Sequence, residues 1–257
     1  MGWWQGKRVL VTGASSGIGQ AIAWELDQLE VAELILVGRD FERLSETVSR
    51  CRVATRVEQV DLSSADETRE LLKRLSNSQI DVLINNAGVG LGGSFQGHDP
   101  DDLLSMIRLN CDAVVLLSRG LLPAMLERQA GGVLFVGSMA GWAGGPGLCG
   151  YSATKGFVNR FAEGLRWELQ GSGVRIGLLA PGVTRTSFFN AAGIDEKDLR
   201  AGSLSAQEVA RAAVNGMEKD RALIVPGLWN QILLRVQSWA PRPLVGWVSR
   251  RMFASIL

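Results

Sequence analysis

The chain has 257 residues, of which 46% are hydrophobic and 21% charged, values that favour a soluble globular protein over a disordered, fibrous or coiled-coil chain. Lysine and arginine number 27 against 26 for aspartate and glutamate, so no overall positive field favours a nucleic-acid partner, and we expect none. Three cysteines and one histidine argue against a disulfide framework and a histidine-rich metal site, so we predict a cytoplasmic protein without a bound metal.

Short β-branched runs alternate with longer stretches of helical periodicity, which indicates repeated βαβ units. Seven strands are predicted, near residues 8–11, 34–37, 56–60, 82–85, 133–136, 175–179 and 223–225. Six helices are predicted between them, near residues 18–29, 41–51, 65–75, 102–122, 151–169 and 206–217. The predicted fold class is α/β: a single Rossmann-type, doubly wound parallel sheet with helices on both faces.

A glycine-rich turn lies directly between the first predicted strand and the first predicted helix. Glycines here let the backbone approach a pyrophosphate, whose charge is stabilised by free N–H groups and the helix dipole. The alternative is a turn that uses glycine only for its positive φ. We predict a dinucleotide site that includes Gly13, Ser15, Ser16, Gly17, Ile18 and Gly19.

Cofactor preference is indicated about 20 residues after the last glycine, where an acidic side chain would bind a ribose 2′-hydroxyl and a basic one a 2′-phosphate. This position is Arg39, at the end of the second predicted strand. A guanidinium can bind phosphate through two hydrogen bonds, so the charge favours NADP over NAD. Two alternatives remain: Arg39 is a solvated residue opening the next helix, or Asp40 binds the ribose hydroxyls.

Asn110 falls within the predicted helix near 102–122, and Tyr151 and Lys155 are spaced four residues apart at the start of the helix near 151–169. Residues at this spacing share one helical face. Tyr151 is the only tyrosine of the chain, and a nearby ammonium lowers the pKa of a phenol by stabilising the phenolate. By itself the pair also fits an ordinary helix surface.

Several motifs together resemble the short-chain dehydrogenase/reductase family over residues 7 to about 225. They occur in the family's order along the chain. They are Gly13, Gly17 and Gly19 of the glycine turn, Asn85-Asn86-Ala87-Gly88, Gly137-Ser138, Tyr151 with Lys155, and Pro181-Gly182 with Thr186. Thr184 is a small departure, because the family usually has Val or Ile there.

The resemblance implies a catalytic set of Ser138, Tyr151, Lys155 and Asn110. Tyr151 is expected to protonate the carbonyl oxygen during hydride transfer and to act as the base in the reverse direction. Ser138 is expected to hydrogen-bond the same oxygen, and Lys155 to bind ribose hydroxyls and lower the phenol pKa. Asn110 is expected to support a water that links Lys155 to solvent, although a mid-helix asparagine is often structural.

The resemblance also implies the cofactor NADP(H) and further residues around it. Asp61 and Leu62 are expected beside the adenine ring, and Asn86, Ala87 and Gly88 along the cofactor from the central strand. The segment after the sixth strand is expected to hold the nicotinamide carboxamide through Pro181, Gly182, Thr184 and Thr186, with Tyr151 and Lys155 also contacting the cofactor.

The side chains that the resemblance places around the substrate are mostly apolar. They are Met139, Trp142, Leu148, Cys149, Phe188 and Phe189. We therefore expect a small apolar carbonyl or alcohol substrate, a ketone or secondary alcohol on a hydrophobic body such as an acyl chain or a cyclic ketone. The alternative for Phe188 and Phe189 is packing into the core.

The last 31 residues, 227–257, carry four arginines and no acidic residue. Apolar positions follow one helical face, two prolines interrupt it, and a second apolar face follows. We predict a dinucleotide-binding and catalytic domain over residues 1–226 and a C-terminal amphipathic helical extension over 227–257, packed on or beside it. This extension resembles an interfacial segment with peripheral membrane contact; the favoured alternative is that it caps the substrate cleft or lies in a subunit interface.

The predicted function is an NADP(H)-dependent oxidoreductase of the carbonyl or 3-oxoacyl reductase type. The alternative from another class is a dinucleotide-binding regulator or scaffold without turnover. A homo-oligomer is expected, because members of the resembled family often pair through the long helices, here near residues 102–122 and 151–169.

Overall fold

A computed structural model describes residues 2–194 and 203–252 of the protein. Its centre is a sheet of seven strands in the order β3-β2-β1-β4-β5-β6-β9, and every neighbouring pair is parallel. The strands are β1 (Arg8–Thr12), β2 (Glu33–Gly38), β3 (Ala54–Gln59), β4 (Val82–Asn85), β5 (Gly131–Val136), β6 (Val174–Leu179) and β9 (Leu223–Ile224). All seven predicted strands belong to this sheet, so the predicted fold class is confirmed.

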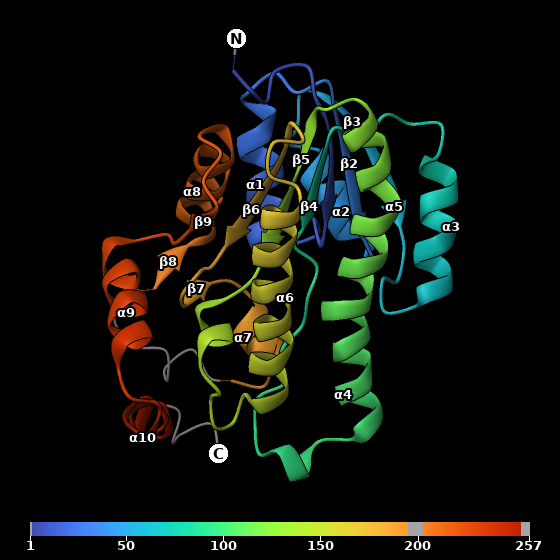
Figure 1. The fold of residues 1–257 in the computed structure, drawn as a ribbon. Helices are drawn as coiled ribbons and strands as arrows, with labels where there is room; N and C mark the ends of the chain where they lie inside the picture. The colour runs from blue at the N-terminus through green and yellow to red at the C-terminus, as the bar shows by residue number, and fades with distance from the viewer. Residues whose placement is uncertain (1, 195–202, 253–257) are drawn as a thin grey trace.

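Helices cover both faces of the sheet, and this requires strands that are apolar on both sides. In β2, Leu34 and Leu36 pack into one core cluster, whereas Ile35 and Val37 pack into the other. The first cluster includes residues of α1 (Gly17–Asp27), α2 (Phe41–Val48) and α8 (Ala206–Glu218), and the second includes residues of α3 (Ala65–Leu75), α5 (Ala113–Glu127) and α6 (Cys149–Glu168). Figure 1 shows the sheet between these two layers.

The helix predicted near residues 102–122 is one continuous stretch from Pro100 to Glu127, formed by α4 (Pro100–Ile107), a π-helical turn (Arg108–Asp112) and α5. By length and hydropathy it could cross a membrane, but 56% of its most apolar window is buried inside the protein. Leu117 and Leu121 pack against the sheet. We therefore assign it as a core helix.

Several short elements were not predicted. A two-stranded parallel sheet joins β7 (Thr184–Arg185) to β8 (Leu204–Ser205), and α7 (Phe188–Ala191) follows β7. Two 3₁₀ turns cover Phe95–Gly97 and Met139–Trp142. Unlike β4 and β9, which lie in apolar runs, the strands β7 and β8 cover two positions only and include polar residues, and three or four residues are too few for a helical period to show.

The C-terminal segment forms α9 (Leu228–Trp239) and α10 (Arg242–Met252), and the break between them falls at Pro241 as the proline positions indicate. In Figure 1 both helices lie at the end of the molecule that carries α7, away from the N-terminus. Residues 253–257 of the predicted extension lie outside the described residues. The division into a domain and an extension stays a prediction.

Candidate active site

A cavity of about 770 Å³ opens where the central parallel strands end. The loops after β1, β4, β5 and β6 line it, because the carboxyl ends of parallel strands meet at one edge of the sheet. Most of the predicted site residues line this cleft: Gly13, Ser15, Ser16, Gly17, Ile18, Arg39, Leu62, Asn86, Ala87, Gly88, Ser138, Met139, Leu148, Tyr151, Lys155, Pro181, Gly182, Thr184, Thr186, Phe188 and Phe189. Five do not: Gly19, Asp61, Asn110, Trp142 and Cys149.

Hydrogen bonds connect the glycine turn to the loop after β4. Thr12 Oγ1 accepts hydrogen bonds from the backbone N–H groups of Asn86 (2.9 Å) and Ala87 (3.0 Å). Gly13 and Gly17 adopt left-handed φ angles of +64° and +57°, which favour glycine. The two predicted motifs are thus one structural unit at the floor of the cleft.

Gly19 lies behind this turn rather than in the cleft. A Cβ atom on Gly19 would lie 2.4 Å from Asn86 Nδ2 and 2.4 Å from the Gly13 carbonyl oxygen. Asn86 Nδ2 itself donates a hydrogen bond to the Thr12 carbonyl oxygen at 2.8 Å. Gly19 therefore shapes the turn by permitting close packing against Asn86.

The turn presents the N-terminus of α1 to the cleft. The N-cap residue, Ser16, makes no side-chain capping hydrogen bond, so the first N–H groups of this 11-residue helix keep their capacity to bind an anion. Ser15, Ser16 and Gly17 all line the cavity. These features fit a dinucleotide pyrophosphate at this end of the cleft.

The mouth of the cleft beside β2 is basic. Arg39 and Arg43 both line it, and Arg43 was not among the predicted residues. Asp40 is used as the N-cap of α2: its side chain accepts a hydrogen bond from Arg43 N at 3.1 Å and forms an ion pair with Arg43 Nε at 3.4 Å. The side chain of Arg39 makes no ion pair with the described residues.

Asp61 does not line the cleft, although its neighbours Val60 and Leu62 do. Its side chain accepts hydrogen bonds from the backbone N–H and the hydroxyl of Ser63 at 2.9 and 2.7 Å.

Within residues 2–194 and 203–252, no group of three or more His, Cys, Asp and Glu side chains could hold a metal ion.

Ser138, Tyr151 and Lys155 meet in the middle of the cleft. Ser138 follows β5 and begins a 3₁₀ turn, where its Oγ accepts a hydrogen bond from Ala140 N at 3.1 Å. Its side chain also acts on the Tyr151 phenol and lowers the pKa of that group. Lys155 Nζ donates to the Val136 carbonyl oxygen at 2.8 Å and lies 5.9 Å from the centre of the Tyr151 ring.

Burial shifts the proton affinities of this group. It raises the pKa of Tyr151 to about 12, against a smaller lowering by the Ser138 hydrogen bond. It also lowers the pKa of Lys155 to about 8. The sequence predicted a phenol pKa lowered by Lys155, but desolvation is the larger effect in the structure, because burial disfavours both charged forms.

Asn110 lies behind the Ser138, Tyr151 and Lys155 group in the π-helical turn, a type of irregularity that is frequent at functional sites. Its Oδ1 accepts from Val89 N at 3.0 Å, and its Nδ2 donates to the Val89 carbonyl oxygen at 2.9 Å and to Thr154 Oγ1 at 3.0 Å. These contacts tie the loop after β4 to α6, and the expected role of Asn110 in supporting a water stays a prediction.

Asn159 is a site residue that the sequence analysis missed. It is 3% exposed. Its Nδ2 donates to the Ser138 carbonyl oxygen at 3.0 Å, and its Oδ1 accepts from Ser138 N at 3.4 Å. It lies one helical turn after Lys155, so the same four-residue spacing that relates Tyr151 to Lys155 would have indicated it.

The far end of the cleft is apolar. The Tyr151 and Phe188 rings lie 5.3 Å apart, Phe188 and Phe189 lie 5.4 Å apart, and the two phenylalanines line the cleft while packing on a small core cluster. Two residues expected near the substrate lie elsewhere: Trp142 packs against the second core cluster, and Cys149 is exposed.

The C-terminal helices close this end of the cleft. Cleft-lining residues on and between α9 and α10 that were not predicted individually are Asn230, Leu233, Val236, Gln237, Ala240, Leu244, Val245, Val248 and Ser249. One side of both helices therefore lies at the cleft.

The sequence and the fold are similar to those of known proteins. A sequence profile of the short chain dehydrogenase family matches residues 7–197. A short-chain dehydrogenase from Sphingobium yanoikuyae in complex with NADPH has a TM-score of 0.82 and 31% identity, covering 90% of this chain and 94% of its own.

Two further solved structures are similar. A bulky-bulky ketone specific alcohol dehydrogenase from Comamonas testosteroni has a TM-score of 0.76 and 28% identity, covering 90% of this chain and 92% of its own. A short chain dehydrogenase/reductase from Burkholderia phymatum in complex with NAD has a TM-score of 0.82 and 26% identity, covering 92% and 94%.

Proposed function

Because the chain belongs to the short-chain dehydrogenase/reductase family, whose members compared above are dehydrogenases, we propose that it transfers hydride between NADP(H) and a ketone or secondary alcohol on an apolar substrate. The observation that carries this proposal is the meeting of Ser138, Tyr151 and Lys155 in a cleft that begins at the glycine turn and ends in apolar side chains. The enzyme type that we propose is a carbonyl or 3-oxoacyl reductase.

The basic mouth of the cleft supports NADP. Arg39 and Arg43 offer two guanidinium groups beside β2, and an arginine binds a 2′-phosphate better than a ribose hydroxyl. Asp40, the acidic alternative, already caps α2 and pairs with Arg43. One similar structure holds NADPH and another NAD, so the preference is a property to be measured on this chain.

The proposed mechanism uses three side chains. When bound, NADPH supplies the hydride. Tyr151 donates the phenolic proton to the substrate oxygen, and Ser138 Oγ hydrogen-bonds the same oxygen and stabilises the charge that develops there. Lys155 binds the ribose hydroxyls and, as an ammonium, favours the phenolate that is left behind.

The pKa values favour reduction at neutral pH. With its pKa raised to about 12, Tyr151 holds its proton and is ready to act as an acid. Oxidation needs the phenolate, whose formation is assisted by the positive charges of Lys155 and of an oxidised nicotinamide ring. We therefore expect alcohol oxidation to be faster at alkaline pH than at neutral pH.

The test is NADPH oxidation by the purified protein with apolar ketones and 3-oxoacyl esters, with NADH in parallel. Wild type should turn over with NADPH in preference to NADH. Tyr151→Phe should lose at least about 10²-fold in kcat, the ordinary contribution of a general acid, while NADPH binding measured by fluorescence stays close to that of wild type.

The same experiment addresses the regulator or scaffold alternative. A protein of that kind would bind NADPH tightly and show no Tyr151-dependent turnover with any ketone of the panel. The buried Ser138, Tyr151 and Lys155 group argues against it, since a buried lysine with a lowered pKa carries a stability penalty that binding alone does not require.

A further inference from the structure

One face of α9 is apolar and exposed to solvent. Trp239 is 91% exposed and Trp229 65%. At 100° per residue they share one face of the helix with four other exposed side chains, opposite the buried Asn230 and Leu234. The six are Leu228, Trp229, Ile232, Leu233, Val236 and Trp239. A contiguous apolar patch of this kind marks a binding surface.

The same surface continues onto α10 and is positively charged. Leu244, Trp247 and Val248 are exposed. Arg250 and Arg251 are also exposed, and the guanidinium of Arg251 lies 5.5 Å from the centre of the Trp247 ring. No acidic residue occurs anywhere from residue 227 to residue 252. The patch therefore combines tryptophan and aliphatic side chains with uncompensated positive charge.

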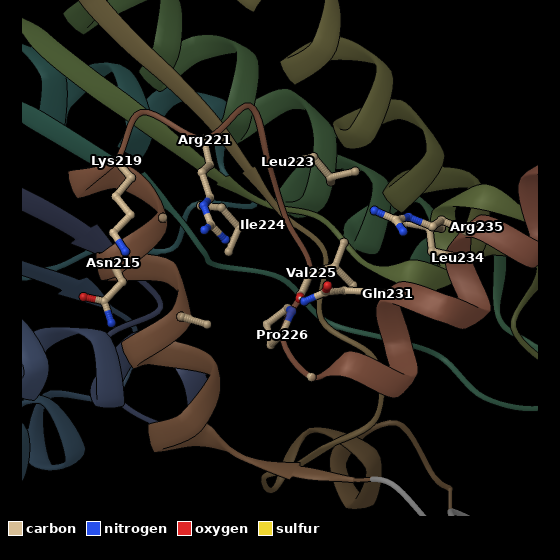
Figure 2. A pocket seen from close by; sticks show the side chains of 13 residues that line it. Asn215, Lys219, Arg221, Leu223, Ile224, Val225, Pro226, Gln231, Leu234 and Arg235 are labelled. Carbon is tan, nitrogen blue, oxygen red and sulfur yellow. The ribbon is translucent and has the colours of Figure 1, made fainter.

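A second group of cations flanks the apolar face of α9. A cavity of about 350 Å³ lies between α8, β9 and α9, and Lys219, Arg221 and Arg235 line it from both sides (Figure 2). None of the three forms an ion pair with a described residue. The nearby carboxylate of Asp220 is paired with Arg166 at 2.9 Å. The cavity thus offers three cations that no carboxylate of the described ranges neutralises.

The position of Arg235 on α9 links this cavity to the apolar face. Arg235 follows Ile232 by three residues and precedes Trp239 by four, so it lies one turn from each on neighbouring helical ridges. A group bound by Arg235 would therefore lie at the border of the apolar face. Tryptophan and arginine around an aliphatic face form the composition that binds the headgroup region of a bilayer.

We infer that α9 and α10 dock this protein on an anionic phospholipid bilayer. The apolar faces enter the interfacial region, and lipid phosphates contact Arg250, Arg251 and the cavity of Lys219, Arg221 and Arg235. A second copy of the chain is the less favoured occupant. In a two-fold contact identical surfaces meet, which would bring the unpaired arginines of both copies together.

This surface is continuous with the cleft. Leu233, Val236, Leu244 and Val248 line the cleft and are also exposed to solvent. On the proposed function, on which this step rests, an apolar carbonyl substrate dissolved in lipid enters the cleft between α9 and α10 without crossing water. The docking itself does not depend on that function.

The test measures binding of the full-length protein to vesicles of phosphatidylcholine alone and of phosphatidylcholine with phosphatidylglycerol, by flotation. Wild type should bind the anionic vesicles at least about tenfold more tightly, and added salt should weaken binding. The double variant Trp229→Ser/Trp239→Ser should lose about tenfold or more. Lys219→Glu with Arg235→Glu should lose about fivefold for each charge removed.

The matched control is Trp167→Ser on α6, another exposed tryptophan (70%) far along the chain from α9, which should bind like wild type. Trp229 and Trp239 do not line the cleft, so their variants should keep NADPH-dependent turnover of a water-soluble ketone. Vesicle binding is measured separately and does not depend on enzyme activity. Absence of vesicle binding, or binding that is equal in the double variant, would overturn the inference. Self-association that needs Trp229 and Trp239 without lipid binding would overturn it in favour of a second copy.

Discussion

At the residue scale, Ser138 is held by Asn159 as well as by its own strand. The asparagine amide bonds both the carbonyl and the N–H of Ser138. We expect Asn159→Ala to lower kcat about tenfold, the equivalent of one lost hydrogen bond of about 1.4 kcal/mol. The KM for NADPH should stay close to that of wild type, because this residue does not line the cleft.

Steady-state kinetics together with thermal unfolding check the role of Asn159. A merely structural residue would lower the unfolding temperature and leave kcat per folded molecule unchanged. The conservative variant Asn159→Ser, which keeps one hydrogen-bonding group, should have a kcat between those of Asn159→Ala and wild type. Equal kcat in all three proteins would contradict a positioning role.

The burial of Lys155 lowers the free energy of unfolding of the protein. Lowering its pKa from 10.5 to about 8 corresponds to roughly 3 kcal/mol, and losing the Val136 hydrogen bond gives back about 1 kcal/mol. We therefore expect Lys155→Met to be inactive, yet about 2 kcal/mol more stable than wild type at neutral pH without cofactor.

The pH dependence identifies the cause of that difference. Between pH 8 and 10.5 the folded wild type binds fewer protons at Lys155 than the unfolded chain, so its free energy of unfolding rises with pH relative to the variant. Below this window the difference is constant. Urea unfolding of both proteins from neutral pH to about pH 10 measures it, and a difference that does not shrink as pH rises through the window would refute the explanation.

Single residues differ in how far the sequence predicts them. Tyr151 and Lys155 are predictable because they are four residues apart in the sequence, a spacing that places both side chains on one face of a helix. Arg43 is not, since its importance depends on where the folded chain places the mouth of the cleft, whereas Asn159 follows Lys155 at the same four-residue spacing and was overlooked. Asp61 shows a further case: it was predicted beside the adenine ring, and the structure adds that its Oδ1 accepts two hydrogen bonds from Ser63, which the sequence pattern does not show, so its contact with the cofactor stays a prediction.

At the scale of elements, the effect of replacing a helical glycine by alanine on stability depends on the space around that glycine. Gly19 in α1 leaves no space for a Cβ atom, whereas Gly164 in α6 has nothing within 4 Å of one. We expect Gly19→Ala to displace the glycine turn, weakening NADPH binding at least about tenfold and lowering stability by about 1–3 kcal/mol. Gly164→Ala should raise stability by about 1 kcal/mol.

Isothermal titration with NADPH and urea unfolding check this pair. Because both changes add one methyl group to a helix, Gly164→Ala controls for helix propensity. Similar NADPH affinity in Gly19→Ala and wild type would show that the turn tolerates the added atom.

Elements were predictable where they form a long periodic segment or lie in an apolar run, as β9 does. The longer strands of the main sheet and the long helices have enough residues for their periodicity to show, and Pro241 marks the break between α9 and α10. The π-helical turn is different: residues 108–112 continue a helical pattern, and only the hydrogen bonds of the folded chain show that the helix widens there.

At the scale of the whole molecule, the cleft depends on the order of the strands. β1 lies between β2 and β4, so the chain turns from one side of the sheet to the other at this point, where ligands bind in doubly wound folds. The sequence indicates a doubly wound sheet. It does not reveal the neighbours of β1, because parallel strands of similar composition differ little in pattern.

Cofactor binding should stabilise the whole fold, since the cleft joins loops from both halves of the sheet. At a free NADPH concentration of about 100 times the Kd we expect about 2.7 kcal/mol of added stability, or roughly 5–10 °C in the unfolding temperature. Arg39→Ser should reduce this gain for NADPH at fixed concentration and leave the smaller gain with NADH unchanged. Differential scanning fluorimetry checks both, and equal losses with the two cofactors would argue against a 2′-phosphate contact.

The phenol in the cleft belongs to the chain's only tyrosine. Fluorotyrosine supplied during biosynthesis will therefore enter the protein at one place, inside the cleft, and give a single ¹⁹F resonance. Its chemical shift will follow the ionisation of that phenol as cofactor, pH or lipid is varied. The molecule thus carries a reporter of its own active site that needs no substitution and no attached probe.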